Sequence, residues 1–580
     1  MAVSSICSFG QWSVLDDDPR LKRHKSEWFI WQPFTQAEWD ASNFAPAKDM
    51  EWFQDLRYGM FISYGLSSYV HKDLSWPIVY DHKLPDPGHG AYPDSAWQIT
   101  WPSLWKMEKF NATEWVQIAK DAGMKYMIII VKHHDGFHMW DTKYSDFKIT
   151  NSPFKRDYLR ELADACHKAN MPIGIYYSQR DWYHPYYEPV DTTIGERIPE
   201  APLFQVKPGK KFAMGASHQK YIEYQYNVIR ELLTNYGKID MFWFDAAWFG
   251  GMFLPEMWDS ENLTRMMRKL QPHIVINNRA SIPGDYDTPE QRIGMYQKRP
   301  WESAMTLNGI WAFDPSYPVK TTKNLIREML VAGSGNGNVL LSWGAKFDGE
   351  FDKAQTDTLL KIGSWLKKYG AAYYGARGGP WMPDRKFGSV YKNNMVYLYV
   401  YDWNQDGLLL PFFKDNAVLK MSFLNVNEKV NWKMTGPNLH VLKPKNPDDI
   451  VTIVALTLRK PVTRVLESGV ATIFDDPAYG SKLLTKEIMD NDWSNGEYTI
   501  DLGEDKNLTG IRIYESDRAI SISTSSDNKS WQDAGEAVGE SADIPVTTFL
   551  TGAYVPGKPG RYLRLKTNNP SSLKLDVYTK

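Results

Sequence analysis

The sequence predicts an α/β protein in which a (β/α)8-type barrel is followed by two antiparallel β-sandwich domains. Three observations support this prediction. From about residue 51 to residue 370, short apolar runs alternate with segments of helical periodicity, as in a parallel sheet whose strands are joined by helices. None of the glycine motifs that bind nucleotides follows these runs. After residue 370, short strand-like segments separated by Gly, Asn, Asp and Ser replace the helices.

The first expected helix of the barrel has recognisable ends. Asn111 is a suitable N-cap, Glu114 three residues later completes a pattern similar to a capping box, and Gly123 ends the helix. The next run, 125–131, is apolar without alternation, as expected for a strand covered on both faces. The other elements continue this pattern. The expected strands are 58–65, 125–131, 172–178, 238–245, 273–279 and 338–343, and the expected helices are 111–123, 157–170, 218–237, 325–334 and 358–370.

A doubly wound open sheet with a nucleotide site is the alternative fold for this alternation. That fold would carry a phosphate-binding glycine loop directly after a strand. The glycine-rich segment 333–338, GSGNGN, matches neither the dinucleotide-binding pattern nor the P-loop pattern. The barrel is therefore the favoured prediction.

The second half of the chain predicts β structure. Segment 389–403 has the character of a hairpin with Asn393 and Asn394 at its turn, and 451–460 alternates like a half-buried strand. Short strands with polar turns continue to the C-terminus, as in a β-sandwich. The predicted parts are an N-terminal extension over 1–50, the barrel over 51–370, an antiparallel β-domain over 371–460 and a β-sandwich over 461–580.

Composition excludes several classes of function. The net charge of −2 provides no strong field for nucleic acid or an anionic membrane. No run of 18 apolar residues is present, so no membrane span is expected. The first residues lack the basic and apolar regions of a signal peptide. Two cysteines, Cys7 and Cys166, exclude a disulfide framework and a thiolate-rich metal site, and Cys166 fits the apolar stripe of a helix. The aromatic content of 14% suits ligands with apolar and hydroxylated faces, such as sugars.

Polar residues follow the expected strands where a barrel carries its active site. Asp245 ends a strand and is flanked by aromatic residues, and Glu290 follows Arg279 by eleven residues. Each such residue alone would suit a capped strand end or a loop salt bridge, but four consecutive strands end this way. A carboxylate placed like Asp245 suits a nucleophile at an anomeric carbon, and a second carboxyl group about 5–5.5 Å away would give a retaining glycosidase. Glu290 is the candidate for that acid/base.

His133, His134 and Asp135 raise the alternative of a metal site. Adjacent side chains on a strand point to opposite faces, so the two histidines are expected to converge poorly on one ion. The sequence also lacks the H-E-x-x-H spacing. We therefore expect no metal and no cofactor, and interpret the imidazoles as groups that bind sugar hydroxyls.

These residues resemble a known family. Segment 110–147, FNATEWVQIAKDAGMKYMIIIVKHHDGFHMWDTKYSDF, is similar to glycoside hydrolase family 29, the α-L-fucosidases. The resemblance extends over the barrel from about 51 to 345, and 447–458 resembles the end of the family's C-terminal β-domain. The shorter matching segments are 52–62, 174–183, 240–248, 276–279, 284–290, 299–303 and 336–344.

The resemblance implies a role for each matching residue. It implies Asp245 as the nucleophile, Glu290 as the general acid/base and Phe61 on the apolar wall that meets the C5 substituent of the sugar. It also implies a carbohydrate substrate and a periplasmic or secreted enzyme. The residues implied around the −1 sugar subsite are His133, His134, Tyr176, Trp243 and Arg279, with Trp301 closing it.

The chain departs from the family pattern at one position. The family usually has F-I-H-W-G where this chain has FISYG, so Ser63 and Tyr64 replace a sugar-binding histidine and its neighbour. Losing the imidazole removes a hydrogen bond and opens space, and a missing partner of this kind changes substrate preference strongly. L-Galactose is fucose with a hydroxyl on C6 and needs that space. Both an α-L-fucoside and an α-L-galactoside of an algal galactan therefore fit as substrates.

The expected mechanism has two steps. Asp245, kept ionised by Arg279 and its imidazole neighbours, attacks C1 while Glu290 protonates the leaving oxygen, and Glu290 then deprotonates water. The pKa of Glu290 is expected to rise to about 6–7 for these roles. The rivals are a non-catalytic glycan-binding protein on the same fold and an oxidoreductase barrel, which the missing phosphate-binding glycines disfavour.

The terminal block resembles a second kind of domain. Segments 493–515 and 522–532 are similar to the discoidin-type sandwich common in carbohydrate-binding modules. A spacer that packs on the barrel is an equally good interpretation, and no binding residues are assigned there.

Overall fold

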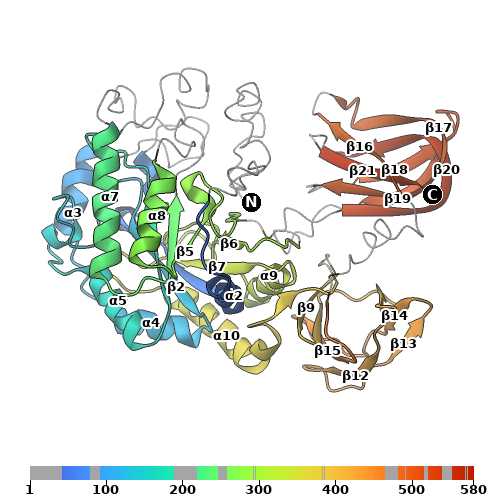
Figure 1. Cartoon of the computed structure of the whole chain (residues 1–580), viewed down its shortest axis with the longest axis horizontal. Helices are drawn as coiled ribbons and strands as arrows, with labels where there is room; N and C mark the ends of the chain where they lie inside the picture. The colour runs from blue at the N-terminus through green and yellow to red at the C-terminus, as the bar shows by residue number, and fades with distance from the viewer. Residues whose placement is uncertain are drawn as a thin grey trace. The chain divides into compact units, whose positions relative to one another are not determined.

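Seven parallel strands form the central sheet of the first half of the chain (Figure 1), in the order β5-β4-β3-β2-β1-β7-β6. Every residue of these strands is buried, as expected for strands covered on both faces. The strands are β1 Tyr58–Ile62, β2 Tyr126–Lys132, β3 Ile173–Ser178, β4 Met241–Asp245, β5 Val275–Ile276, β6 Glu302–Met305 and β7 Asn338–Trp343.

The structure is a computed structural model and divides the chain into two units. The first consists of Met1–Glu290, Arg299–Thr322 and Asn338–Lys368, and the second of Gln291–Lys298, Lys323–Gly337 and Tyr369–Lys580. Within the residues that the structure describes, no helix is long and apolar enough to cross a membrane. The described residues are 42–78, 92–187, 218–245, 258–291, 293, 296–381, 383, 386–463, 465, 481–489, 492–514, 520–537, 551–568, 570 and 573–579.

Residues 285–290 connect the two edge strands of the sheet and complete the barrel. Tyr286 pairs with Asn277 just after β5, and Glu290 pairs with Ala304 in β6, both in parallel. The peptide N–H of Asp285 donates to Ile276 at 2.7 Å, and the N–H of Ala304 donates to Pro289 at 3.1 Å. This segment occupies the place of an eighth strand, so the architecture is a (β/α)8-like barrel, as predicted.

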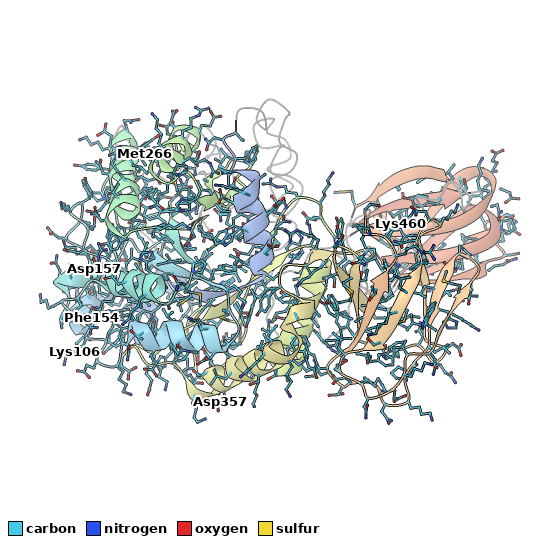
Figure 2. All side chains as sticks on the ribbon, turned by 60° about the horizontal axis from the view of Figure 1, so that its bottom comes forward. Lys106, Phe154, Asp157, Met266, Asp357 and Lys460 are labelled. Carbon is cyan, nitrogen blue, oxygen red and sulfur yellow. The ribbon has the colours of Figure 1, made fainter. Side chains whose placement is uncertain are left out.

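Helices surround the parallel strands, and α4, α5, α7 and α8 lie outside the sheet in Figure 1. The Asn111 side chain accepts a hydrogen bond from the Glu114 N–H at 3.2 Å, so the predicted N-cap is confirmed. Asp157, labelled in Figure 2, caps α5 in the same way at Arg160, and Cys166 is buried in that helix. The longer helices are α2 Ala47–Leu56, α4 Ala112–Asp121, α5 Tyr158–Lys168, α7 His218–Asn235, α8 Ser260–Leu270, α9 Thr322–Ser334 and α10 Lys353–Tyr369.

The sequence did not predict β6 or the closing segment 285–290. β6 is only four residues long and contains Glu302 and Ser303, so it lacks an apolar run. The closing segment makes isolated bridges instead of a continuous ladder, and it contains three acidic residues and a proline. Both are held by neighbouring strands, which is information that a local pattern does not contain.

The second unit contains a β-domain of two antiparallel sheets, ordered β12-β15-β10-β9-β8 and β11-β14-β13. The predicted hairpin is β9 and β10, joined at Asn393 and Asn394. The predicted half-buried strand, β15, is almost fully buried because it pairs with β10 and β12 within the larger sheet. The strands are β8 Arg377–Gly378, β9 Phe387–Lys392, β10 Met395–Val400, β11 Leu408–Pro411, β12 Val418–Phe423, β13 Trp432–Thr435, β14 Asn438–Val441 and β15 Thr452–Leu458.

The last block forms antiparallel strands in the order β16-β21-β17-β20-β18-β19 around an apolar core of its own. Both C-terminal parts fit the predicted β-sandwiches. The register of the long strand β17 shifts between Asp501 and Lys506 and again between Leu508 and Gly510. The strands are β16 Ser481–Ile488, β17 Glu497–Tyr514, β18 Ile520–Ser525, β19 Gln532–Ala537, β20 Thr551–Lys566 and β21 Leu573–Thr579.

We expect barrel closure to depend on Asp285, whose side chain is fully buried. Its two carboxylate oxygens accept hydrogen bonds from Arg268 Nη2, at 2.8 and 2.7 Å. They also accept hydrogen bonds from the backbone N–H groups of Ala45 and Ile276, each at 2.7 Å. Asp285→Ala leaves these donors and a mostly buried cation unpaired, so stability should fall by about 3–5 kcal/mol. Urea unfolding of the full chain measures the loss.

The matched control is Asp164→Ala. Asp164 pairs with Arg160 at 4.0 Å on the surface of α5, and both side chains are exposed. This variant should change stability by about 0–1 kcal/mol. Equal losses in the two variants would contradict the structural role of Asp285.

Candidate active site

One arginine joins the two acidic side chains that the sequence singled out. Arg279 is buried, and its Nη1 and Nη2 atoms donate to Asp245 Oδ1 and Glu290 Oε2, each at 2.9 Å. Because both carboxylates bind the same planar guanidinium, the two oxygens lie within about 8 Å of each other. Thr288 holds the arginine in turn, accepting from Nε at 3.0 Å through its hydroxyl and from Nη2 at 3.1 Å through its carbonyl. The structure therefore brings Asp245, Glu290 and Arg279 together.

Asp245 is the last residue of β4, so its carboxylate stands at the carboxyl end of the parallel sheet. The Tyr176 hydroxyl, from the neighbouring strand β3, donates to its Oδ2 at 2.5 Å. Arg279 donates to Oδ1. Each carboxylate oxygen thus has its own donor, which fixes the orientation of the group.

Glu290 lies at the end of the closing segment, and its side chain is 19% exposed. Burial raises the pKa of this carboxyl above its ordinary value, the Arg279 cation lowers it, and the negative charge of Asp245 raises it again. The net direction is upward, as expected for a general acid. A third carboxyl, Asp73, lies near it and accepts from the Trp311 N–H at 3.2 Å. Burial raises the pKa of Asp73 to about 7, and the charge of Glu290 adds to this rise.

The two adjacent histidines lie together, which corrects one expectation. We expected His133 and His134 to point to opposite faces, but their ring centroids are only 3.8 Å apart. Both follow the end of β2, so strand alternation does not apply to them. Nδ1 of His133 shares a hydrogen bond with Ser75 Oγ at 2.7 Å, and Nδ1 of His134 with Ser178 Oγ at 2.6 Å.

Both imidazoles are neutral near pH 7. Burial lowers the pKa of His133 to about 3, with the Lys132 cation adding to the effect. Burial also lowers the pKa of His134 well below its ordinary value. They therefore offer hydrogen-bonding nitrogen atoms to a ligand and carry no positive charge.

The same cluster has the residue types of a metal site. One potential ligand atom each from His133, His134 and Asp245 lies within 4.8 Å of the others. However, Arg279 and Tyr176 already donate to the two oxygens of Asp245, and the guanidinium would repel a cation there. This chemistry favours a hydroxylated ligand, and the lack of a metal stays a prediction.

Aromatic rings form one wall of the site. The Phe61 ring lies 5.6 Å from Tyr176, 5.7 Å from Trp243 and 5.9 Å from Trp311, measured between centroids. Tyr176 also stacks on His133 at 5.7 Å with an interplanar angle of 10°. Phe61 therefore lies beside Tyr176, which donates to Asp245, and it provides an apolar surface next to this carboxylate.

Ser63 and Tyr64, which stand where the family usually has histidine and tryptophan, contact different parts of the molecule. The Ser63 hydroxyl lies 3.0 Å from Ser342 Oγ, which lies 2.8 Å from the Trp311 carbonyl. Ser63 therefore shares the neighbourhood of Phe61 and Trp311. The Tyr64 ring lies among Trp105, Trp115 and Tyr158, and its hydroxyl donates to the Phe347 carbonyl at 2.8 Å. Tyr64 thus packs against the helices outside the barrel.

Trp301 does not join this cluster. It precedes β6, whose first residue pairs with the first residue of β7, so its backbone lies at the amino-terminal end of the strands. Asp245 ends β4 and Glu290 ends the closing segment, both at the opposite, carboxyl-terminal end of the strands. Its expected position near the sugar subsite therefore differs from its position in the structure, because β6 was not recognised in the sequence.

Sequence reasoning missed several residues of the site. Trp311 hydrogen-bonds Glu290 and touches Phe61, yet it lies in a loop without a strand signal. Ser75 and Ser178 orient the histidines, and small hydroxyl side chains are too common to stand out. Trp76 packs against His134 at 5.7 Å between centroids. The sequence signal that was available is the polar and aromatic cluster KDLSWP after the first strand.

Comparisons with known proteins agree with this geometry. The family model for alpha-L-fucosidase matches residues 30–371, more than half of the chain. The chain belongs to the alpha-L-fucosidase family. Human plasma alpha-L-fucosidase is 25% identical over 411 residues, covering 66% of this chain and 82% of that protein. Human tissue alpha-L-fucosidase is 26% identical over 436 residues, covering 69% and 86%.

Solved structures of alpha-L-fucosidases show the same fold. Isoenzyme 1 from Paenibacillus thiaminolyticus has a TM-score of 0.59 and 29% identity, covering 71% of this chain and 99% of that one. The enzyme from Bacteroides thetaiotaomicron has a TM-score of 0.61 at 24% identity, covering 72% and 96%. The chain is thus a glycoside hydrolase of the α-L-fucosidase type. The family model ends at residue 371, so the discoidin-like character of the last block stays a prediction.

The raised pKa of Glu290 predicts the pH profile of this fucosidase-family enzyme. If Glu290 is the general acid, as expected, kcat/KM should fall as the pH rises through this raised pKa. The basic limb should therefore lie above the pH at which an ordinary carboxyl titrates. Steady-state rates with an aryl α-L-fucoside across pH measure this limb.

Glu290→Gln provides the control for this prediction. It cannot titrate, so the basic limb should disappear, and activity should persist best on substrates whose leaving groups need no proton. If the basic limb is unchanged in Glu290→Gln, the limb reports the titration of a different group. Asp73, whose pKa is also raised and which lies near Glu290, is the first candidate for that group.

Proposed function

We propose that the chain is a retaining, exo-acting α-L-glycosidase that removes terminal α-L-fucose or the related α-L-galactose from glycans by double displacement. The arrangement of Asp245 and Glu290 on one buried guanidinium carries this proposal. It supplies two carboxyl groups at the mouth of a barrel, with neutral imidazoles and aromatic rings beside them.

In the first step Asp245 Oδ attacks the anomeric carbon and the bond from C1 to the leaving oxygen breaks. Glu290 gives its proton to that oxygen, so the leaving group departs as an alcohol. Arg279 and the Tyr176 hydroxyl keep the nucleophile aimed, since each donates to one oxygen of Asp245. The product of this step is an ester between the sugar and Asp245.

In the second step Glu290 acts as a base. The ester has no negative charge, so the contribution of Asp245 that raised the pKa of Glu290 is removed. The pKa of Glu290 then falls while the Arg279 cation remains, which favours the carboxylate. Glu290 takes a proton from water, the water oxygen bonds to C1, and Asp245 leaves with the configuration retained.

The nucleophile is tested with Asp245→Asn. Turnover of an aryl α-L-fucoside should fall by about 10⁴-fold or more, because the amide cannot form the glycosyl ester. Azide should restore part of the rate by replacing the carboxylate. Proton NMR of the first product formed by the wild type should show the α-anomer.

Asp164→Asn, on the surface of α5, is the matched control and should keep full activity. Full activity in Asp245→Asn would remove that residue from the role. A first product with the β-anomer would replace retention with inversion. Sugar binding without any turnover by the wild type would favour a glycan-binding protein instead.

The substrate's C6 group is expected to lie beside Ser63. A hydroxyl has one proton, so if Ser342 donates to the Trp311 carbonyl, Ser63 donates to Ser342 and its own lone pairs accept from a ligand. The 6-hydroxyl of L-galactose can donate to Ser63, whereas the methyl group of L-fucose cannot. The adjacent Phe61 ring suits the methyl group, so both sugars are accepted and Ser63 favours galactose.

Ser63→Ala tests this preference. The ratio of kcat/KM for α-L-galactoside over α-L-fucoside should fall by about 3- to 10-fold, the value of one hydrogen bond. Parallel assays with the two aryl glycosides measure the ratio. Ser152→Ala, a buried serine whose hydroxyl donates to Ile149 at 2.5 Å, should leave it unchanged. A ratio unchanged in Ser63→Ala would separate Ser63 from the C6 group.

A further inference from the structure

A buried carboxyl group lies behind the nucleophile and takes no part in the steps above. Glu302, the first residue of β6, is fully buried. Its Oε1 accepts from the indole N–H of Trp243 at 3.1 Å, and its Oε2 is hydrogen-bonded to the Tyr126 hydroxyl. A carboxyl in this environment is costly to bury unless it is hydrogen-bonded. Its contacts therefore indicate what it does.

The indole that Glu302 holds supports both donors of the nucleophile. The guanidinium carbon of Arg279 lies 4.4 Å from the centroid of the Trp243 ring, a cation–π contact. The Tyr176 ring stacks on Trp243 at 5.4 Å with an interplanar angle of 22°. Arg279 and Tyr176 are the residues that donate to the two oxygens of Asp245.

Arg279 extends the same chain of contacts to the acid/base. Its other nitrogen donates to Glu290, and its charge lowers the pKa of that group. A rotation or shift of the Trp243 indole would therefore move Asp245 and Glu290 together. The hydrogen bond from Trp243 to Glu302 adds to the packing of the indole in opposing such a movement, because an unpaired buried N–H costs free energy.

We propose that Glu302 is a positioning residue for the hydrolysis. It fixes the Trp243 indole, and through Arg279 it sets the positions of Asp245 and Glu290. This inference rests on the proposed function, since it concerns the same two carboxyl groups.

The proposal needs the acceptor oxygen of Glu302 and not its charge. The indole N–H only donates, so Oε1 accepts from it whether or not the carboxyl is protonated. A glutamine keeps an acceptor oxygen for Trp243, and its amide N–H can donate to the Tyr126 oxygen. A methionine fills a similar volume but offers no such acceptor.

The experiment compares Glu302→Gln and Glu302→Met in the full chain with an aryl α-L-fucoside. Glu302→Gln should stay within about 3-fold of the wild type, whereas Glu302→Met should lose about 10- to 100-fold in kcat, the scale of a misplaced catalytic group. The basic limb of the pH profile should also move to higher pH in Glu302→Met, because a displaced Arg279 lowers the pKa of Glu290 less. Thermal unfolding checks that each variant is folded.

Tyr126→Phe is the matched control. It removes the hydrogen bond between the Tyr126 hydroxyl and Glu302 and leaves the contact with Trp243 in place. This variant should keep the pH profile of the wild type even where stability falls. A merely structural role for Glu302 would lower stability in Tyr126→Phe and Glu302→Met without moving either profile, and that result would overturn the proposal.

Trp243→Phe provides a second route if Glu302→Met does not fold. It keeps an aromatic face under Arg279 but removes the N–H that Glu302 binds, so kcat should fall and the limb should again move upward. An unmoved limb in this variant overturns the proposal. The failure of this proposal can be distinguished from the failure of the proposed function. If Asp245→Asn is inactive but the basic limb does not move in Glu302→Met or Trp243→Phe, only the role of Glu302 is overturned. If Asp245→Asn is active, the proposed function and the role of Glu302 are overturned together.

Discussion

A single buried guanidinium links the parts of this site. Arg279 is 2% exposed and holds two carboxylates, each at 2.9 Å. Removing the cation would leave two like charges close together in a buried place, which is unfavourable for both. The positions of Asp245 and Glu290 are therefore not independent. The guanidinium holds both carboxyl groups in place, while burial, and not this contact, raises the pKa of Glu290.

Closure of the barrel and assembly of the site involve the same segment. Glu290 lies on the segment that bridges β5 and β6, and Arg279 lies just before it in the chain. Thr288 connects the two parts, because it accepts from Arg279 and donates to Asn278 at 2.8 Å. The irregular eighth strand thus places the carboxyl group of Glu290 at the carboxyl-terminal end of the strands, the end at which barrels carry their active sites.

Charge and hydroxyl recognition are divided between different residues. Arg279 carries the positive charge at Asp245, while burial keeps His133 and His134 neutral. Each imidazole uses Nδ1 for a serine hydroxyl, so the ring orientation is set by Ser75 or Ser178. Neutral, oriented imidazoles suit sugar hydroxyls, which donate and accept.

The sequence alone determined the alternating α/β architecture, the capped helix at Asn111 and the strand end that carries Asp245, because each has a local pattern of period, cap or apolar run. It also indicated Glu290 and Arg279, first as polar residues that follow an expected strand and then through the resemblance to a family. Only the tertiary structure decided that segment 285–290 closes the barrel, that His133 and His134 lie side by side, and that Trp301 lies at the other end of the strands. These features depend on pairing and packing between residues far apart in the chain. A local pattern contains no information about such contacts.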